Sequence, residues 1–458
     1  MSTMIQQIVE DFTTKVLETF CSERVLKLEE VEKELKEKTD DFILKTMQNY
    51  VEALDDAIVA DKAGRKKKAI VIERREEKRE LYTLFGQLRF KRTYFYNKRD
   101  DEYIYIADKA VGLEGYDRVS NTVAVKLADH ACDVSYGKSS KYVTDGNVSR
   151  QTVMMKLRKM SELKVAEPIE KKLVKVLYVN ADEDHVTLQD GTKTIVPLIS
   201  IHEGIELRGK RGRCKNTRYI SSHGKANEDL WLEASKYIYD SYDDEYLERI
   251  YLHGDGAKWI SEGINWLPKA KKVLDKYHLN KAVIGVTGRA FDKQQALLAV
   301  LYKGDKKRYN KILKELKEAV CDEKQEKKLK EFKRYINNNW DAICIHSKED
   351  CGGSCTEGHV SHILSSRLSS RPMGWSKDGL RIMAELRAFK NSGGHLTTYD
   401  FQSKERVEYK VSKKMRTMAK KAFTDALNER IGNITLLSRG KVMPIFGCLR
   451  GLRDGYEI

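Results

Sequence analysis

The sequence lacks the features of a membrane or secreted protein. None of the apolar runs in its 458 residues approaches the roughly 18 residues that cross a bilayer. The N-terminus has no basic segment followed by an apolar one, as a secretory signal would. The eight cysteines include no pair spaced Cys-x-x-Cys, which argues against a disulfide framework. We therefore expect a protein of the cytoplasm with no membrane partner.

Acidic residues are scarce relative to basic ones. The sequence contains 85 Lys and Arg against 69 Asp and Glu, a formal net charge of +16. A basic chain favours a polyanionic partner, most often nucleic acid, because neutralising phosphates releases their counterions. A DNA partner would associate the protein with the nucleoid. A ribosome or an anionic membrane surface would give the same charge balance, so charge indicates a class of partner and not a function.

Two apolar segments lead into carboxylates. Residues 174–179 are rich in β-branched and aromatic side chains and are followed by Asp182, Glu183 and Asp184. Residues 250–252 lead in the same way into Asp255. A buried parallel strand presents polar side chains to a ligand at its carboxyl edge, and carboxylate oxygens are ligands of hard divalent cations. The pattern predicts a metal site built by two strands.

The order of elements between residues 166 and 288 predicts the fold. We expect strands and helices in the order strand 174–182, strand 194–202, strand 217–222, helix 227–242, strand 249–255, short helix 259–266 and strand 271–277. This is the order of the ribonuclease-H-like α/β fold, in which the first and fourth strands lie side by side. Asp182 and Asp255 would then meet at one end of the sheet.

The regions around this core have different patterns. Residues 1–83 carry apolar side chains at helical spacing and are expected to form a helical region. Residues 84–165 begin with alternating apolar and basic side chains, which predict a β-ribbon, and continue as helices. The Lys-rich residues 289–345 predict a helical insertion. Residues 346–458 would complete the core and end in a tail with a basic helix near residues 413–427.

Part of the second region resembles a helix-turn-helix. Residues 136–143 would form the first helix and residues 145–147 the turn, and Ser149 would cap a second helix that reaches DNA. An ordinary three-helix unit gives a similar pattern. The side chains that we expect at DNA are Arg150, Gln151, Thr152 and Lys156 on the second helix and Arg208, Lys210, Arg211 and Arg213 in a basic loop between core strands.

A third acid follows the sheet. Glu357 lies near the start of a predicted helix, where folds of this kind supply a third carboxylate. The motifs VNADEDHV, LHGDGAKWI, VLDKYHL and TEGHVSHILSSRLSSRPMGW resemble those of bacterial insertion-sequence transposases of the DDE type. Within that group they resemble the Mutator-like branch, and in particular the Lre-type family of Gram-positive bacteria. The resemblance extends from about Leu84 to about Phe389.

The resemblance implies specific roles. By match to the motifs, Asp182, Asp255 and Glu357 would be the catalytic, metal-binding triad. Asp275 and His278, spaced Asp-x-x-His, match a motif that Mutator-like enzymes carry between the second Asp and the Glu. The implied activity is metal-dependent cleavage and strand transfer on double-stranded DNA, at the element ends and the target. It would use two Mg²⁺ ions, with Mn²⁺ as a substitute, in a homo-oligomer.

Three alternatives stay open at this point. Asp184 follows the same apolar segment as Asp182 and could replace it in the triad. The chain could also be a catalytically inactive DNA-binding remnant of a transposase. Finally, a cysteine- and histidine-rich stretch could bind zinc or hold unliganded thiols; its members are Cys344, His346, Cys351, Cys355, His359 and His362.

Overall fold

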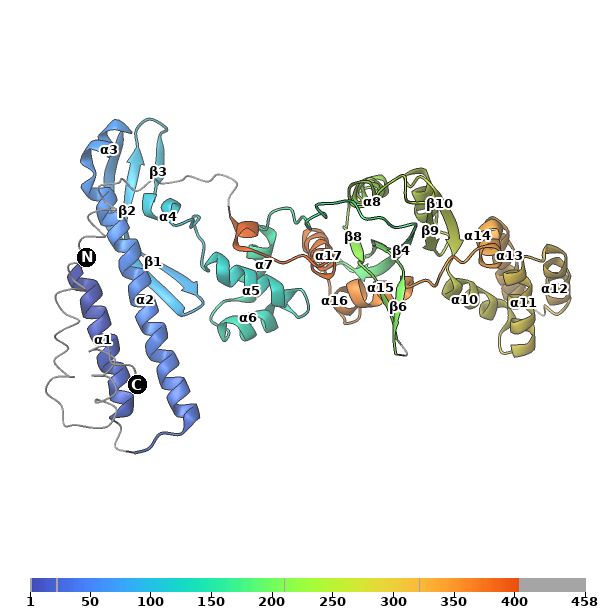
Figure 1. Ribbon diagram of the computed structural model, residues 1–458, viewed down its shortest axis with the longest axis horizontal. Coiled ribbons are helices and arrows are strands. Elements are labelled where there is room, and N and C mark those ends of the chain that lie inside the picture. The colour runs from blue at the N-terminus through green and yellow to red at the C-terminus, as the bar shows by residue number, and fades with distance from the viewer. Residues whose placement is uncertain (1, 22–23, 210, 321, 403–458) are drawn as a thin grey trace. The chain divides into compact units, whose positions relative to one another are not determined.

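The computed structural model describes residues 2–21, 24–209, 211–320 and 322–402 (Figure 1). The chain forms two compact units, each described here by itself. The first contains residues up to Leu127 together with Ser139–Val153, and the second contains Ala128–Lys138 and Met154–Asp400. Among the described residues, no helix has the length and apolar character needed to span a membrane. The basic helix expected near residues 413–427 lies outside the described residues.

The first unit begins with helices, as predicted. These are α1 (Ser2–Phe20), α2 (Leu28–Ala60) and α3 (Lys62–Lys67). The rings of Phe12 and Phe42 lie 4.6 Å apart between α1 and α2, and Lys15 pairs with Asp41 at 2.8 Å. The apolar spacing of both helices therefore serves to pack them on one another.

A β-ribbon follows and packs on α2. Its strands are β1 (Ile70–Thr83), β2 (Gly86–Asn97) and β3 (Glu102–Ile104), all antiparallel. Val51 of α2 packs on Leu88 and Phe90 of β2. The ribbon begins at Ile70, earlier than the predicted start near Leu84. The sequence did not reveal β1 because charged residues and two register shifts near Arg74 hide its alternation.

Four short helices come next, and the last two have the bounds of the predicted helix-turn-helix. They are α4 (Ile106–Ala110), α5 (Asn121–Ala131), α6 (Tyr136–Thr144) and α7 (Arg150–Arg158). The turn after α6 uses left-handed backbone at Asp145 (φ 49°) and Gly146 (φ 82°). Ser149 Oγ accepts a hydrogen bond from Thr152 N at 3.2 Å, the cap that the sequence indicated.

A five-stranded mixed sheet organises the second unit. In space the order is β10-β9-β4-β5-β8, and the strands are β4 (Val176–Thr187), β5 (Lys193–His202), β8 (Arg218–Ser221), β9 (Arg249–Gly254) and β10 (Ala270–Leu274). Strands β4, β5 and β8 are antiparallel neighbours, whereas β4, β9 and β10 are parallel. The predicted pairing of the first and fourth strands is confirmed, since β4 lies beside β9.

Two details of the sheet differ from the prediction. Strand β4 does not end at Asp182 but continues to Thr187, because β5 pairs with it beyond the point where β9 stops. The segment expected as a basic loop is a hairpin of β6 (Ile205–Arg208) and β7 (Arg211–Cys214).

The two faces of the sheet have different roles. Leu177, Val179 and Ala181 of β4 pack on Leu230 and Trp231 of the helix α8 (Asn227–Ser241). Because side chains alternate along a strand, Asn180, Asp182 and Asp184 lie on the opposite face, with residues 350–369 over it. The face that carries Leu177, Val179 and Ala181 is thus covered by α8, and α9 (Lys258–Glu262) and the 3₁₀ turn η1 (Gly263–Asn265) follow β9 on this side.

Helices complete the unit. The insertion predicted over residues 289–345 is helical, and its apolar core also includes the preceding helix. The helices are α10 (Lys276–Thr287), before the predicted bounds, and α11 (Phe291–Lys303), α12 (Lys306–Glu318), α13 (Glu323–Asn338) and α14 (Trp340–Lys348). The remaining elements are α15 (Thr356–His359), the π-helical turn η2 (Val360–Ser365), α16 (Ser366–Leu368), α17 (Lys377–Asn391) and η3 (Thr398–Phe401).

Candidate metal and active site

Three aspartates lie at the same level of the sheet, where β9 and β10 end and β4 continues. The register pairs Asn180 of β4 with His253 of β9, so Asp182 and Asp255 are level two residues further on. The register also pairs Gly254 with Leu274, the last residues of β9 and β10. Asp255 and Asp275 are the next residues of the two strands and therefore lie at the same level. Since neighbouring strands are about 4.8 Å apart, the sequence needs nothing beyond parallel pairing to bring these acids together.

Glu357 reaches this part of the sheet from a segment anchored to it. Asn180 Oδ1 accepts hydrogen bonds from Cys355 N and Thr356 Oγ1, both at 3.4 Å. Ser354 Oγ donates to Asp275 Oδ2 at 2.5 Å. These contacts fix the residues immediately before Glu357, which is the second residue of α15 and has an exposed side chain.

The anchored segment completes a group of potential metal ligands. One atom each from Asp182, His278 and Glu357 lies within 4.8 Å of the others. His278 is on α10, one turn after Asp275, whose carboxylate caps that helix by accepting from Tyr277 N at 2.6 Å. The Nδ1 atom of His278 is buried and has no hydrogen-bond partner among the described residues.

The electrostatics of Asp182 fit a cation site. Its side chain is 8% exposed. Burial, and to a smaller extent the charges of Asp255 and Glu357, raise the pKa of Asp182 to about 6, against the lowering effects of the Glu183 N–H and His278. A bound cation would compensate this repulsion. Carboxylate oxygens are the ligands that Mg²⁺ and Mn²⁺ prefer, so the donor set fits a hard divalent ion.

The loop that carries Asp255 is held from both sides. Its Oδ1 accepts from Ala257 N at 2.7 Å, and its backbone carbonyl accepts from the Tyr335 hydroxyl of α13 at 2.7 Å. The next residue, Gly256, has φ 93°, and a Cβ there would lie 2.7 Å from Asn339 Oδ1. The helical insertion therefore helps to position the second acid.

Asp184 has a different environment from Asp182. Its carboxylate oxygen Oδ1 accepts from Ser365 Oγ at 3.0 Å and from Ser369 Oγ at 2.9 Å. These bonds tie β4 to η2 and to the end of α16. Asp184 thus uses one oxygen to hold the segment after Glu357, and its Oδ2 is buried with no hydrogen-bond partner among the described residues. Asp182, and not Asp184, lies in the group with His278 and Glu357, which favours Asp182 as the metal ligand. Asp275 is engaged through both oxygens, to Tyr277 and Ser354.

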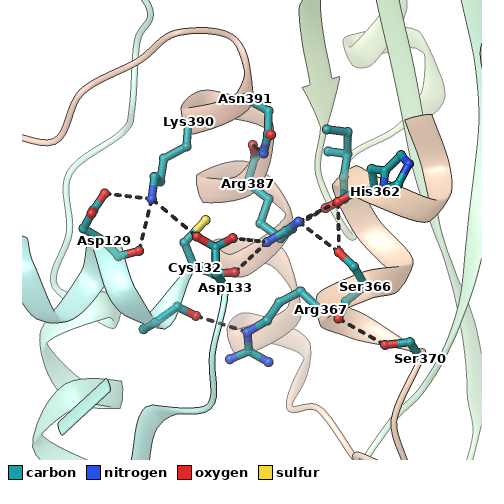
Figure 2. Close-up of polar contacts among 12 residues, drawn as sticks. Asp129, Cys132, Asp133, His362, Ser366, Arg367, Ser370, Arg387, Lys390 and Asn391 are labelled. Atoms are coloured by element: carbon teal, nitrogen blue, oxygen red, sulfur yellow. Dashed lines mark hydrogen bonds and ion pairs between the residues drawn. The ribbon is translucent and has the colours of Figure 1, made fainter. Parts of the chain in front are cut away.

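Two buried arginines, Arg367 and Arg387, also hold the segment that follows Glu357, and the sequence analysis predicted neither (Figure 2). Arg387 of α17 donates to the carbonyls of His362, at 2.6 Å, and of Ile363, which lie in the π-helical turn. It also donates to Cys132 O at 2.7 Å and pairs with Asp133 at 2.8 Å. Arg367 donates to Ala131 O at 3.1 Å. A π-helical turn shifts the usual hydrogen-bond pattern, and Arg387 satisfies the carbonyls there.

Of the side chains expected at DNA, only some are exposed among the described residues. Arg150 and Gln151 are exposed, and Thr152 is half-buried. Lys156 departs from the prediction because it is buried: it follows Val153 by three residues and shares its inward-facing side of α7. Arg213 is exposed on β7. Lys210 lies outside the described residues, as do the side chains of Arg208 and Arg211.

The cysteine- and histidine-rich stretch does not form a single cluster in the described structure. Cys351 Sγ lies 3.2 Å from His346 Nδ1, with His346 Nε2 2.8 Å from Leu274 O. Cys355 instead lies 3.1 Å from Cys214, a residue of β7 that the sequence analysis did not connect with it. Their separation of more than a hundred residues left no local spacing signal.

Comparison with known proteins identifies relatives over nearly the whole chain. The family described as "Uncharacterised protein family (UPF0236)" matches residues 21–405. A UPF0236 protein of Caldanaerobacter subterraneus subsp. tengcongensis is 40% identical over 457 residues, covering 98% of this chain and 97% of its own. Another from that organism, whose name joins eleven designations, is 40% identical over 459 residues, with the same coverage. A UPF0236 protein of Streptococcus gallolyticus is 26% identical over 387 residues, 80% of this chain and 83% of its own.

Proposed function

The chain belongs to the UPF0236 family, and from its carboxylate site we propose that it is a DDE-type transposase. It would cleave DNA at the ends of an insertion sequence and transfer the strands to a target, using divalent metal ions. The observation that carries the proposal is the ligand group of Asp182, Glu357 and His278, with Asp255 level with Asp182 directly after the neighbouring strand and close enough to raise its pKa.

The strand arrangement supports the proposal. The sheet has three antiparallel strands, and two parallel strands follow along the chain, each preceded by a helix. We expect this arrangement in a ribonuclease-H-like core. In such a sheet the first and fourth strands supply two acids, and a later helix supplies the third. The long separation between Asp255 and Glu357 is accounted for by helices α11 to α14.

The residue types suit phosphodiester chemistry. When bound, two Mg²⁺ ions activate the attacking water or 3′-hydroxyl and stabilise the leaving oxygen. Asp182, Asp255 and Glu357 would hold these ions, and Asp182 would release its proton as it does so. Glu357 is exposed, so the site is open to a large substrate. His278 lies beside the carboxylates and can donate a hydrogen bond to a phosphate oxygen.

Features outside the site support a DNA substrate. The net charge of +16 provides the electrostatic attraction that non-specific DNA binding requires. Arg150 and Gln151 begin a capped helix and are exposed, as in a recognition helix. One relative's name joins eleven designations, which agrees with a sequence that recurs within a genome, as a mobile element does.

The test is strand cleavage on a duplex that spans the junction between the element end and its flanking DNA. The wild type should cleave with Mg²⁺ and not with EDTA. Asp182→Asn, Asp255→Asn and Glu357→Gln should each abolish cleavage while still binding the duplex. Asp184→Asn is the matched control and should retain activity. Binding without cleavage in either Mg²⁺ or Mn²⁺ would instead identify a DNA-binding remnant.

A further inference from the structure

A second group of potential ligands lies beside the carboxylate site and has different chemistry. It consists of His202 at the end of β5, Cys214 at the end of β7 and Cys355 just before α15. One atom from each lies within 4.8 Å of the others, and the two sulfur atoms are 3.1 Å apart. Three separate segments of the second unit therefore converge on one point with two thiols and an imidazole.

His202 is placed as a ligand would be. Its side chain is fully buried, and its Nε2 has no hydrogen-bond partner among the described residues. Its Nδ1 lies 3.1 Å from the Gly204 carbonyl and 3.2 Å from the Gly204 N–H. In the tautomer whose Nδ1 donates to the carbonyl, Nε2 carries the free lone pair that a metal needs. An imidazole that bonds a backbone carbonyl through one nitrogen commonly binds a metal through the other. Tyr178 stacks on the ring at 5.4 Å and fixes its plane.

We propose that His202, Cys214 and Cys355 bind a soft divalent cation, Zn²⁺ being the best fit. Thiolate and imidazole ligands select zinc over magnesium. A Zn–S bond of about 2.3 Å places two tetrahedral sulfur ligands about 3.8 Å apart, so the thiols need only a small outward movement. The open cavity lined by Cys214, Cys355 and His359 gives an ion access to the sulfur atoms.

The fourth position is left to His359 or to a water molecule. The His359 ring lies 6.2 Å from that of His202, edge to face. Its Nδ1 is 2.8 Å from Ser200 Oγ, which leaves Nε2 as its available nitrogen.

The ion would have a role in the carboxylate site. Cys355 lies two residues before Glu357, and its backbone N–H already bonds Asn180 on β4. A metal bridge from Cys355 to β5 and β7 would fix the start of α15 more firmly than that bond of 3.4 Å. This role rests on the proposed function, whereas metal binding itself does not. The zinc site is thus a positioning site for Glu357.

The test measures metal bound to the full chain, purified under reducing conditions. We expect about one equivalent of zinc by mass spectrometry of metals, and replacement by Co²⁺ should give a thiolate-to-cobalt charge-transfer band. Cys214→Ser and Cys355→Ser should each lower zinc affinity by roughly tenfold or more. Cys21→Ser, at an exposed thiol remote in sequence, is the matched control and should bind as the wild type. Circular dichroism would verify that both site variants are folded, and His202→Gln provides a third variant that keeps both thiols.

Several outcomes would overturn the proposal. These are a chain without zinc or a cobalt–thiolate band, zinc binding unchanged in all three variants, or a Cys214–Cys355 disulfide found in place of the metal. The two proposals fail separately. A protein that binds zinc but does not cleave DNA overturns only the transposase proposal, and one that cleaves DNA without zinc overturns only this inference.

Discussion

At the scale of single residues, the protonation of Asp182 is the most informative property of the site. The folded protein raises the pKa of this carboxyl to about 6, mainly by burial, whereas an unfolded Asp titrates near ~3.9. Between about pH 4 and pH 6 the Asp182 carboxyl is therefore protonated in the folded state and ionised in the unfolded state. In the absence of a cation, this carboxyl lowers stability as the pH rises from about 4 to about 6, and the loss persists above that range.

This sign gives a prediction for Asp182→Asn. In Mg²⁺-free buffer at neutral pH the variant should be more stable than the wild type, by about 2 kcal/mol, because it removes a buried charge repelled by its neighbours. Near pH 4 the two proteins should unfold alike. Urea unfolding at both pH values measures the difference. A variant less stable than the wild type at neutral pH would mean that the Asp182 carboxylate is not under electrostatic strain.

At this scale the sequence was enough to predict that Asp182 and Asp255 lie level on neighbouring strands, but not which residues support them. Asp182 and Asp255 were predictable because parallel pairing brings strand ends together. Asn180 and Ser354 were not, since their bonds join residues more than 170 positions apart or depend on a loop conformation. The local sequence also did not distinguish Asp184 from Asp182. Its two serine partners arrive from a helix that only the folded chain brings near.

At the scale of elements, the segment from α15 to α16 depends on α17. Arg387 of α17 donates to two carbonyls of the π-helical turn, to Cys132 O and to Asp133 (Figure 2). Its side chain is almost fully buried, so these carbonyls have no water to replace it. The position of Glu357 therefore rests in part on an arginine thirty residues further along the chain.

Arg387→Lys tests this dependence. Lysine keeps the charge but cannot make the same set of planar hydrogen bonds, so we expect a loss of about 2–3 kcal/mol in unfolding free energy. Arg381→Lys, at a half-exposed position of the same helix paired with Glu385, is the matched control and should change stability by less than about 0.5 kcal/mol. Equal effects of the two substitutions, in urea unfolding, would contradict the role given to Arg387.

The elements themselves were predicted unevenly. The order and type of the core strands, the helix-turn-helix bounds and the helical insertion were predictable because their apolar spacing is regular. Strand β1 was not, since charged residues interrupt its alternation. The β6–β7 hairpin reads as a basic loop because its strands have four residues each. The π-helical turn within the predicted helix has no signature that a helical period would reveal.

At the scale of the whole molecule, the excess of basic charge would govern the binding of the proposed DNA substrate. With a net charge of +16, binding to any duplex should weaken steeply as salt increases, because each neutralised phosphate releases counterions. Charge alone gives no sequence preference. That preference must come from side chains that reach base edges, and Arg150 and Gln151 are the exposed candidates.

Arg150→Ala separates the two contributions. If Arg150 reaches a base edge, its loss should weaken binding to the element end by about 1–3 kcal/mol and leave non-specific binding nearly unchanged. Lys327→Ala, an exposed charge of α13, controls for the loss of one positive charge. Fluorescence anisotropy with specific and random duplexes, at several salt concentrations, measures both. An equal loss on both duplexes would make Arg150 a phosphate contact.

The central claim is that Asp182 directly binds the metal that cleaves DNA, and a change of metal preference tests it most directly. Asp182→Cys replaces a hard oxygen ligand by a sulfur, which binds Mg²⁺ poorly and softer ions better. The measurement is the cleavage rate of the element-end duplex in Mg²⁺ and in Mn²⁺. We predict that Asp182→Cys is inactive with Mg²⁺ and regains cleavage with Mn²⁺, whereas Asp184→Cys shows no such switch. Equal activity of Asp182→Cys in both metals, or a switch at Asp184 alone, would contradict the account.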